Sequence, residues 1–106
     1  MWKIDKGSQT GTTTSAYVSA LDWKAEELRE KTIVLKNMAS SASLKYRLLA
    51  CAVADGFNSE EISETILLAG QVAKIQIVKQ WARLIVQVID GSGHAAYQID
   101  YIGQGA

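Results

Sequence analysis

Apolar and polar residues alternate with a period of two along most of the chain. In the stretch 31–37, Ile33 and Leu35 are separated by residues that would face the opposite side. Such alternation is typical of half-buried strands. It predicts strands at 15–23, 31–37, 43–56, 61–70, 71–80, 83–89 and 95–102. About seven strands at short, regular spacing predict an all-β fold, an antiparallel β-sandwich of the jelly-roll or immunoglobulin-like kind.

Two segments near the start of the chain depart from this alternation. Residues 23–30 are rich in helix formers and follow Asp22, a suitable N-cap, so we expect a short helical turn there. Residues 1–14 are polar and rich in glycine and threonine. This composition predicts a flexible N-terminal arm, followed by a single β-sandwich domain over 15–106.

The last two predicted strands flank the segment DGSGH, which contains the single histidine of the chain, His94. Its glycines can adopt the positive φ angles of tight hairpin loops, so we interpret the segment as a hairpin turn. A catalytic histidine needs a nucleophile or an orienting carboxylate within reach, and Ser92 and Asp90 are close in sequence. The spacing matches no known catalytic arrangement and hairpin tips are solvated. We therefore assign no catalytic residue and predict a protein that is not an enzyme.

Composition narrows the classes of partner. In 106 residues, 11 basic side chains balance 11 acidic ones, whereas nucleic-acid-binding proteins usually carry a basic excess. Cys51 is the single cysteine and lies in the apolar run LLACAVA, which indicates a packed thiol and no disulfide. We expect no metal and no cofactor. No run approaches the ~20 apolar residues of a membrane helix and the chain starts without a signal-peptide pattern, so we expect synthesis in the cytoplasm and no membrane partner.

The aromatic residues divide into two groups. Tyr46, Tyr97 and Tyr101 fall on the apolar faces of their strands, so we expect them in the core. Large apolar side chains near strand ends, or near the tip of the N-terminal arm, favour contact with a partner subunit instead. These candidate interface residues are Trp2, Ile4, Trp23 and Trp81.

A family resemblance is carried by two segments, EKTIVLKNMASSASLKYRLLACAVADG and AGQVAKIQIVKQWARLIVQVIDGSGHAAYQIDYIG. They resemble small β-sandwich structural proteins of tailed-phage virions, of the head decoration or cement type. The shared features are a strand ending in KN that leads to an LKYR-like strand, and an ARLIVQV-type strand that runs through a glycine-serine loop into the last strand. The resemblance covers residues 30–103. It implies a non-enzymatic structural protein of a bacteriophage virion that binds capsid or other virion proteins and forms a homo-oligomer.

Two other classes of function stay open. A carbohydrate-binding module, or a receptor-binding (adhesin) domain, would be favoured by an exposed, coplanar row formed by Trp23, Trp81 and a tyrosine. A small enzyme would need a polar pocket around His94.

Overall fold

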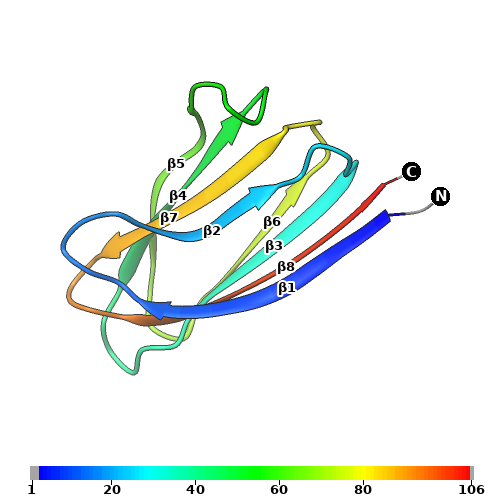
Figure 1. The fold of residues 1–106 in the computed structure, drawn as a ribbon. Helices are drawn as coiled ribbons and strands as arrows, with labels where there is room; N and C mark the ends of the chain where they lie inside the picture. Colours follow the sequence, from blue (N-terminus) through cyan, green and yellow to red (C-terminus); the bar gives the residue numbers. More distant parts are fainter. Residues whose placement is uncertain (1–2, 106) are drawn as a thin grey trace.

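The protein is described here by a computed structural model that covers residues 3–105, in which eight β-strands and no helix occur (Figure 1). The strands form two antiparallel sheets of four. The first sheet has the order β1-β8-β3-β6 and the second has the order β2-β7-β4-β5. The strand bounds are β1 Lys3–Thr12, β2 Val18–Lys24, β3 Glu30–Asn37, β4 Leu44–Cys51, β5 Ser59–Leu67, β6 Val72–Ile77, β7 Arg83–Asp90 and β8 Ala96–Gly105.

Consecutive strands lie in different sheets, with the exception of β4 and β5, which are neighbours in the second sheet. Eight antiparallel strands connected in this way form a jelly roll. The predicted antiparallel sandwich is confirmed, and the seven predicted strands correspond to β2–β8. The predicted number of strands is wrong because the first strand, β1, was assigned to the arm.

The core lies between the two sheets and is built from the inward-facing positions of the strands. Ile33 and Leu35 of β3, Leu48 of β4, Val86 of β7 and Ile99 of β8 have no exposed surface. Burying one such aliphatic side chain contributes roughly 1.5–3 kcal/mol. The same alternation that predicts the strands therefore also provides the main stabilising force of the fold.

The prediction of a helical turn near residues 23–30 is wrong. β2 continues to Lys24, and a reverse turn closed by a hydrogen bond from Leu28 N to Ala25 O (3.0 Å) leads into β3. Ala25 and Leu28 are both buried, and Ala25 N donates to Ala82 O at 2.9 Å. These tertiary contacts outweigh the local preference of the segment for a helix.

The prediction of a flexible arm over residues 1–14 differs from the structure as well. Residues 3–12 form β1, which pairs with β8 in unbroken register from Lys3 opposite Gly105 to Thr12 opposite Ala96. Main-chain hydrogen bonds to β8 hold this strand in place. A strand of polar composition can therefore form at the edge of an antiparallel sheet. Trp2, one of the candidate interface residues, lies outside the described residues.

Two glycines of β1 make room for aromatic rings of β8. Gly7 lies opposite Tyr101 and Gly11 lies opposite Tyr97, and a Cβ atom at either glycine would collide with the facing ring. Aromatic rings that cover cross-strand glycines replace the missing side chains. Tyr97 and Tyr46 are buried and Tyr101 packs against the core, which confirms the prediction for all three tyrosines.

Two buried polar side chains fix the loops at the two ends of β3. Lys31, at the start of the strand, is 1% exposed, and its ammonium group donates to the carbonyl oxygens of Leu28 (2.9 Å) and Lys79 (2.8 Å). Burial lowers the pKa of this amine. Asn37, at the end of the strand, is fully buried, and its amide donates to one carbonyl of the β3–β4 loop and to one of β5.

Candidate functional site

The segment DGSGH connects the two sheets and is not a hairpin. Its flanking strands, β7 and β8, belong to different sheets. None of its glycines has a positive φ angle; within residues 3–105 that conformation occurs at Gly70 (φ 78°), between β5 and β6. A turn signal shows that the chain reverses, but in a jelly roll most reversals cross from one sheet to the other.

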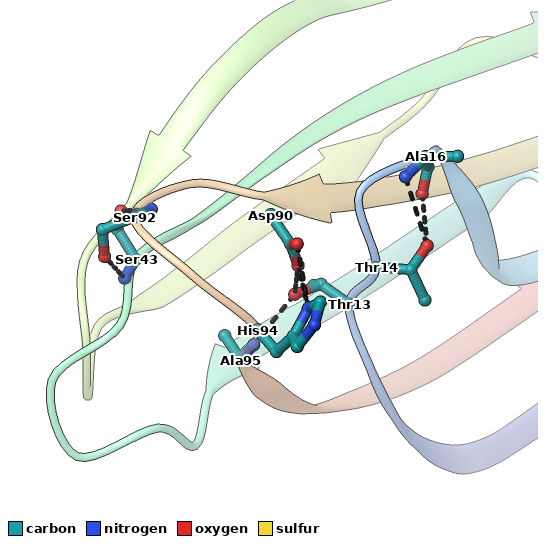
Figure 2. Close-up of polar contacts among 8 residues, drawn as sticks. All are labelled: Thr13, Thr14, Ala16, Ser43, Asp90, Ser92, His94 and Ala95. Carbon is teal, nitrogen blue, oxygen red and sulfur yellow. Dashed lines mark hydrogen bonds and ion pairs between the residues drawn. The ribbon is translucent and has the colours of Figure 1, made fainter.

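Asp90 is the centre of a polar cluster beside this loop (Figure 2). His94 Nδ1 lies 3.0 Å from Asp90 Oδ1 and 2.9 Å from Oδ2. The hydroxyl of Thr13, which is 1% exposed, donates to Asp90 Oδ1 at 2.6 Å and accepts a hydrogen bond from Ala95 N at 2.9 Å. The contact with Thr13, and after it the contact with His94, holds the pKa of the Asp90 carboxyl below its usual value.

Ser92 is held by the β3–β4 loop and does not join this cluster. Ser43 N donates to Ser92 Oγ and Ser92 N donates to Ser43 Oγ, both at 2.9 Å (Figure 2). Gly91 N donates to Ser43 O at 3.0 Å, and a Cβ atom at Gly91 would collide with the Ser43 main chain. The structure therefore brings His94 and Asp90 together, while the hydroxyl of Ser92 fixes one loop against another.

This arrangement is suited to holding loops in place. A histidine base acts on a nucleophile or substrate within hydrogen-bond reach. In the described chain, the polar partner of His94 is the carboxylate of Asp90. The His94 side chain is 69% exposed. Cys51 is fully buried, as predicted, and its thiol donates to Asn58 Oδ1 at 3.0 Å. Residues 3–105 contain no group of three or more His, Cys, Asp or Glu side chains placed to hold a metal ion, and no helix long and apolar enough to cross a membrane.

Trp23 lies in the core, so its prediction as an interface residue is wrong. Its side chain is 4% exposed, its indole Nε1 donates to Asp5 Oδ2 at 2.9 Å, and its ring packs against Tyr101 with 4.8 Å between the ring centroids. The signal that places Trp23 inward is present in the sequence, because Leu21, Trp23 and Ala25 follow one another at period two. Proximity to a strand end was the weaker criterion.

Trp81 borders a group of exposed apolar side chains at the end of the sandwich opposite to His94. It is half-buried, and its indole N–H is buried without a hydrogen-bond partner among the described residues. Phe57 and Val53 of the β4–β5 loop are 87% and 62% exposed and line a pocket of about 250 Å³ together with Trp81. Val78, in the neighbouring β6–β7 loop, is 77% exposed. We call Val53, Phe57, Val78 and Trp81 the apolar loop end.

Sequence reasoning missed the apolar loop end, apart from Trp81. The available signal was a phenylalanine placed in the polar turn DGFNSEE, where a core position is not expected. Because Trp23 is buried, the exposed row of Trp23, Trp81 and a tyrosine is not formed. The aromatic side chain that lines a pocket together with Trp81 is Phe57.

Ile4 lies on the outer surface of the first sheet and is 59% exposed. Ile102, which pairs with Lys6 two residues further along β1, is 48% exposed and lines a shallow groove of about 450 Å³ over β1, β8 and β3. Ile4 is thus an exposed side chain of a regular strand rather than the tip of a mobile arm.

The outer surface of the second sheet carries a small polar network. The guanidinium group of Arg47 lies 3.9 Å from the centroid of the Tyr17 ring, and Arg47 Nε donates to Gln87 Oε1 at 2.8 Å. The Tyr17 hydroxyl donates to the Glu64 carboxylate, and this hydrogen bond raises the pKa of Tyr17. These groups bind one another across the sheet, which leaves the apolar loop end as the more open surface.

No protein-family model matches the chain, and no curated protein matches its sequence. Solved structures do share its fold. A chain of the Bacillus endospore appendages, described as disulfide-linked pili, is 8% identical with a TM-score of 0.64, and the match covers 99% of this chain and 89% of that one. The SPBc2 prophage-derived protein YomS is 14% identical with a TM-score of 0.55, over 97% of this chain and 96% of that one.

A third similar structure is the VP2 subviral particle of infectious bursal disease virus. It is 9% identical with a TM-score of 0.61, and the match covers 96% of this chain but 32% of the VP2 chain. The structural neighbours thus include a pilus protein, a prophage protein and a viral particle protein. At identities this low, the similarity establishes the fold alone.

Proposed function

We propose that the chain is a non-enzymatic structural subunit of a phage virion, a capsid decoration (cement) protein or a related surface protein, that binds neighbouring subunits through the apolar loop end. The observation that carries this proposal is the exposure of Phe57 (87%) and Val53 (62%) in one pocket with Trp81, at the end of the sandwich where Val78 (77%) is exposed as well. Large apolar side chains exposed together favour a protein-binding surface.

The polar side chains that could take part in catalysis support a structural role instead, because their hydrogen bonds hold loops in place. Asp90 is bound by Thr13 and His94, and Ser92 exchanges hydrogen bonds with Ser43. The jelly roll supplies a rigid body, and a net charge of zero tolerates dense packing of copies. Viral capsid proteins use this architecture often, although the fold by itself does not decide the function.

The apolar loop end would contribute to binding by burying its apolar side chains. Burying an aromatic side chain such as Phe57 contributes roughly 1.5–3 kcal/mol before ordering costs.

The proposal is tested on phage particles released from a strain that carries the gene. Mass spectrometry of purified particles should find the protein at a level comparable to other particle proteins. Particles that lack it should bind added wild-type protein in a co-sedimentation assay, and Phe57→Ser should weaken this binding at least tenfold. The matched control is Ile66→Ser, which removes an apolar side chain of β5 that is 59% exposed. Absence from the particles, or equal binding by the Phe57 and Ile66 variants, would contradict the proposal.

A second candidate function is carbohydrate binding by the same surface. Aromatic rings can pack on sugar rings, and Phe57 and Trp81 line a pocket of about 250 Å³. A glycan array with wild-type protein and Phe57→Ala separates the two functions. Glycan binding that depends on Phe57, without association with particles, would favour this candidate.

A further inference from the structure

The free edge of β1 is an open site for pairing with another strand. β1 and β6 are the edge strands of the first sheet, and β2 and β5 are the edge strands of the second. An edge strand presents unpaired N–H and C=O groups to its surroundings. Soluble proteins usually protect such edges with bulges, charged side chains or a short strand.

Three of the four edges carry such protection. β2 has a bulge between Ser19 and Leu21 in its pairing with β7. The register of β5 against β4 shifts twice, and β5 carries three glutamates. β6 is six residues long and has a lysine, Lys74, near its middle. Each of these features discourages pairing with a further strand.

β1 lacks all of them along most of its length. It has ten residues, and its register with β8 continues without a shift from one end to the other. Its charged residues lie at positions 3–6, so residues 7–12 (GSQTGT) are uncharged, and the chain contains no proline. Ser8, Gln9 and Thr10 are exposed in the middle of this stretch.

We propose that β1 pairs antiparallel with β1 of a second copy of this chain, around a two-fold axis near Ser8. Strand addition relies on main-chain hydrogen bonds and therefore needs a partner with an equally open edge. Among the described strands, β1 is the edge that meets this condition. The two first sheets then form one continuous sheet of eight strands, which is the self-complementary contact that a two-fold dimer requires.

The charges of β1 fit this pairing. With the axis at Ser8, residues 4–12 of one copy lie opposite residues 12–4 of the other, so that Lys6 faces Thr10 and Ile4 faces Thr12. The charged part of each strand thus lies beside the uncharged part of its partner. No like charges face each other across the new pair, and such facing charges would destabilise it.

Sedimentation equilibrium of the isolated protein over a wide range of concentrations tests the proposal. The wild type should dimerise, and Ser8→Lys should raise the dissociation constant at least tenfold because it places two lysines opposite each other at the axis. Thr32→Lys is the matched control, since it adds the same charge to the same outer surface two strands away from the edge. It should leave the dimer unchanged.

A second variant does not depend on charge. Ser8→Cys should form an intermolecular disulfide on oxidation, whereas Thr32→Cys should not, and Cys51 is fully buried and does not compete. A wild type that stays monomeric at every concentration would overturn the proposal. Equal dissociation by Ser8→Lys and Thr32→Lys, or equal cross-linking by the two cysteine variants, would do the same. Because these measurements need no phage particle, the outcome is independent of the proposed virion function.

Discussion

Replacing Gly7 with alanine should destabilise the protein, although the residue lies on an edge strand. A Cβ atom at this position would meet the hydroxyl, Cζ and Cε1 atoms of Tyr101. The Tyr101 ring has little freedom to move, because it packs against Trp23 with 4.8 Å between the ring centroids and Trp23 is itself buried. The added methyl group therefore has to displace either the ring or the edge strand.

The expected magnitude follows from two opposing effects. Forcing a methyl group into a packed site costs about 1–3 kcal/mol. Alanine in place of glycine regains roughly 0.5–1 kcal/mol, because it restricts the unfolded chain. The free energy of unfolding should thus fall by ~1–2 kcal/mol. For a domain of this size, each kcal/mol lowers the melting temperature by roughly 4–8 °C.

Thermal and urea unfolding of Gly7→Ala, with Gly93→Ala as the matched control, measure this loss. A Cβ atom at Gly93 meets its nearest neighbour, Ala42 Cβ, at an ordinary 3.9 Å. That control should stay within about 0.5 kcal/mol of the wild type. In a Tyr101→Leu background, which lacks the colliding atoms, the cost of Gly7→Ala should disappear. Equal stability of the two alanine variants, or an undiminished cost in the leucine background, would refute the packing argument.

Four other variants test the remaining structural claims. Deleting β1 should prevent stable folding, seen as loss of a cooperative thermal transition, because β8 loses one of its two neighbouring strands along its whole length. Lys31→Met should be as stable as the wild type at neutral pH, or more stable by up to about 3 kcal/mol. The difference in free energy of unfolding between Lys31→Met and the wild type, measured in urea, should shrink as the pH rises toward 10.5. Burial lowers the pKa of Lys31, so the folded wild type releases this proton at a lower pH than the unfolded chain does, and the wild type gains stability over that pH range. Thr13→Val should cost about 1–3 kcal/mol, because it leaves the buried Ala95 N–H without its acceptor, whereas His94→Ala should change stability by less than about 0.5 kcal/mol. Because the Thr13 hydroxyl lowers the pKa of Asp90, the difference between wild type and Thr13→Val should narrow in acid unfolding as the pH falls through that lowered pKa.

The strands from β2 to β8 could be predicted because burial and sequence pattern have the same cause there. A strand with one face in the core needs apolar side chains at every second position, and that requirement is visible in one sequence. β1 has no such requirement. It is held by the main chain of β8, and its fit depends on Gly7 and Gly11 lying opposite Tyr101 and Tyr97, which are 94 and 86 residues away in the sequence. The two glycines have the same spacing as the two tyrosines, but this match becomes informative only once β1 is known to pair with β8.

The period-two rule would have located more of the interior if it had been continued to the strand ends. Lys31 and Asn37 share the inward parity of Ile33 and Leu35 and are buried with them. Polar side chains are uncommon at core positions, and both of these bind main-chain carbonyl groups of the loops and of β5 near the sandwich ends. Those loop partners are set by the tertiary fold, so the local sequence carried no sign of them.

The two proposed surfaces have a defined relation to each other. β1 begins at the end of the sandwich that carries the apolar loop end (Figure 1). Ile4 of β1 pairs with Gln104, which pairs in turn with Glu30 at the start of β3. The next residue, Lys31, donates to the carbonyl of Lys79 in the loop that contains Val78. An antiparallel pair of β1 strands would therefore point the two apolar loop ends in opposite directions. One dimer could contact two separate partner subunits, and the second contact would gain from the effective concentration that the first one creates. On this reasoning, Ser8→Lys should weaken binding to particles by removing the second contact, while Phe57→Ser should remove the contact itself and leave the dimer intact. If Ser8→Lys dissociates the dimer and binding to particles keeps its full strength, the two surfaces act independently and the bivalent arrangement is wrong.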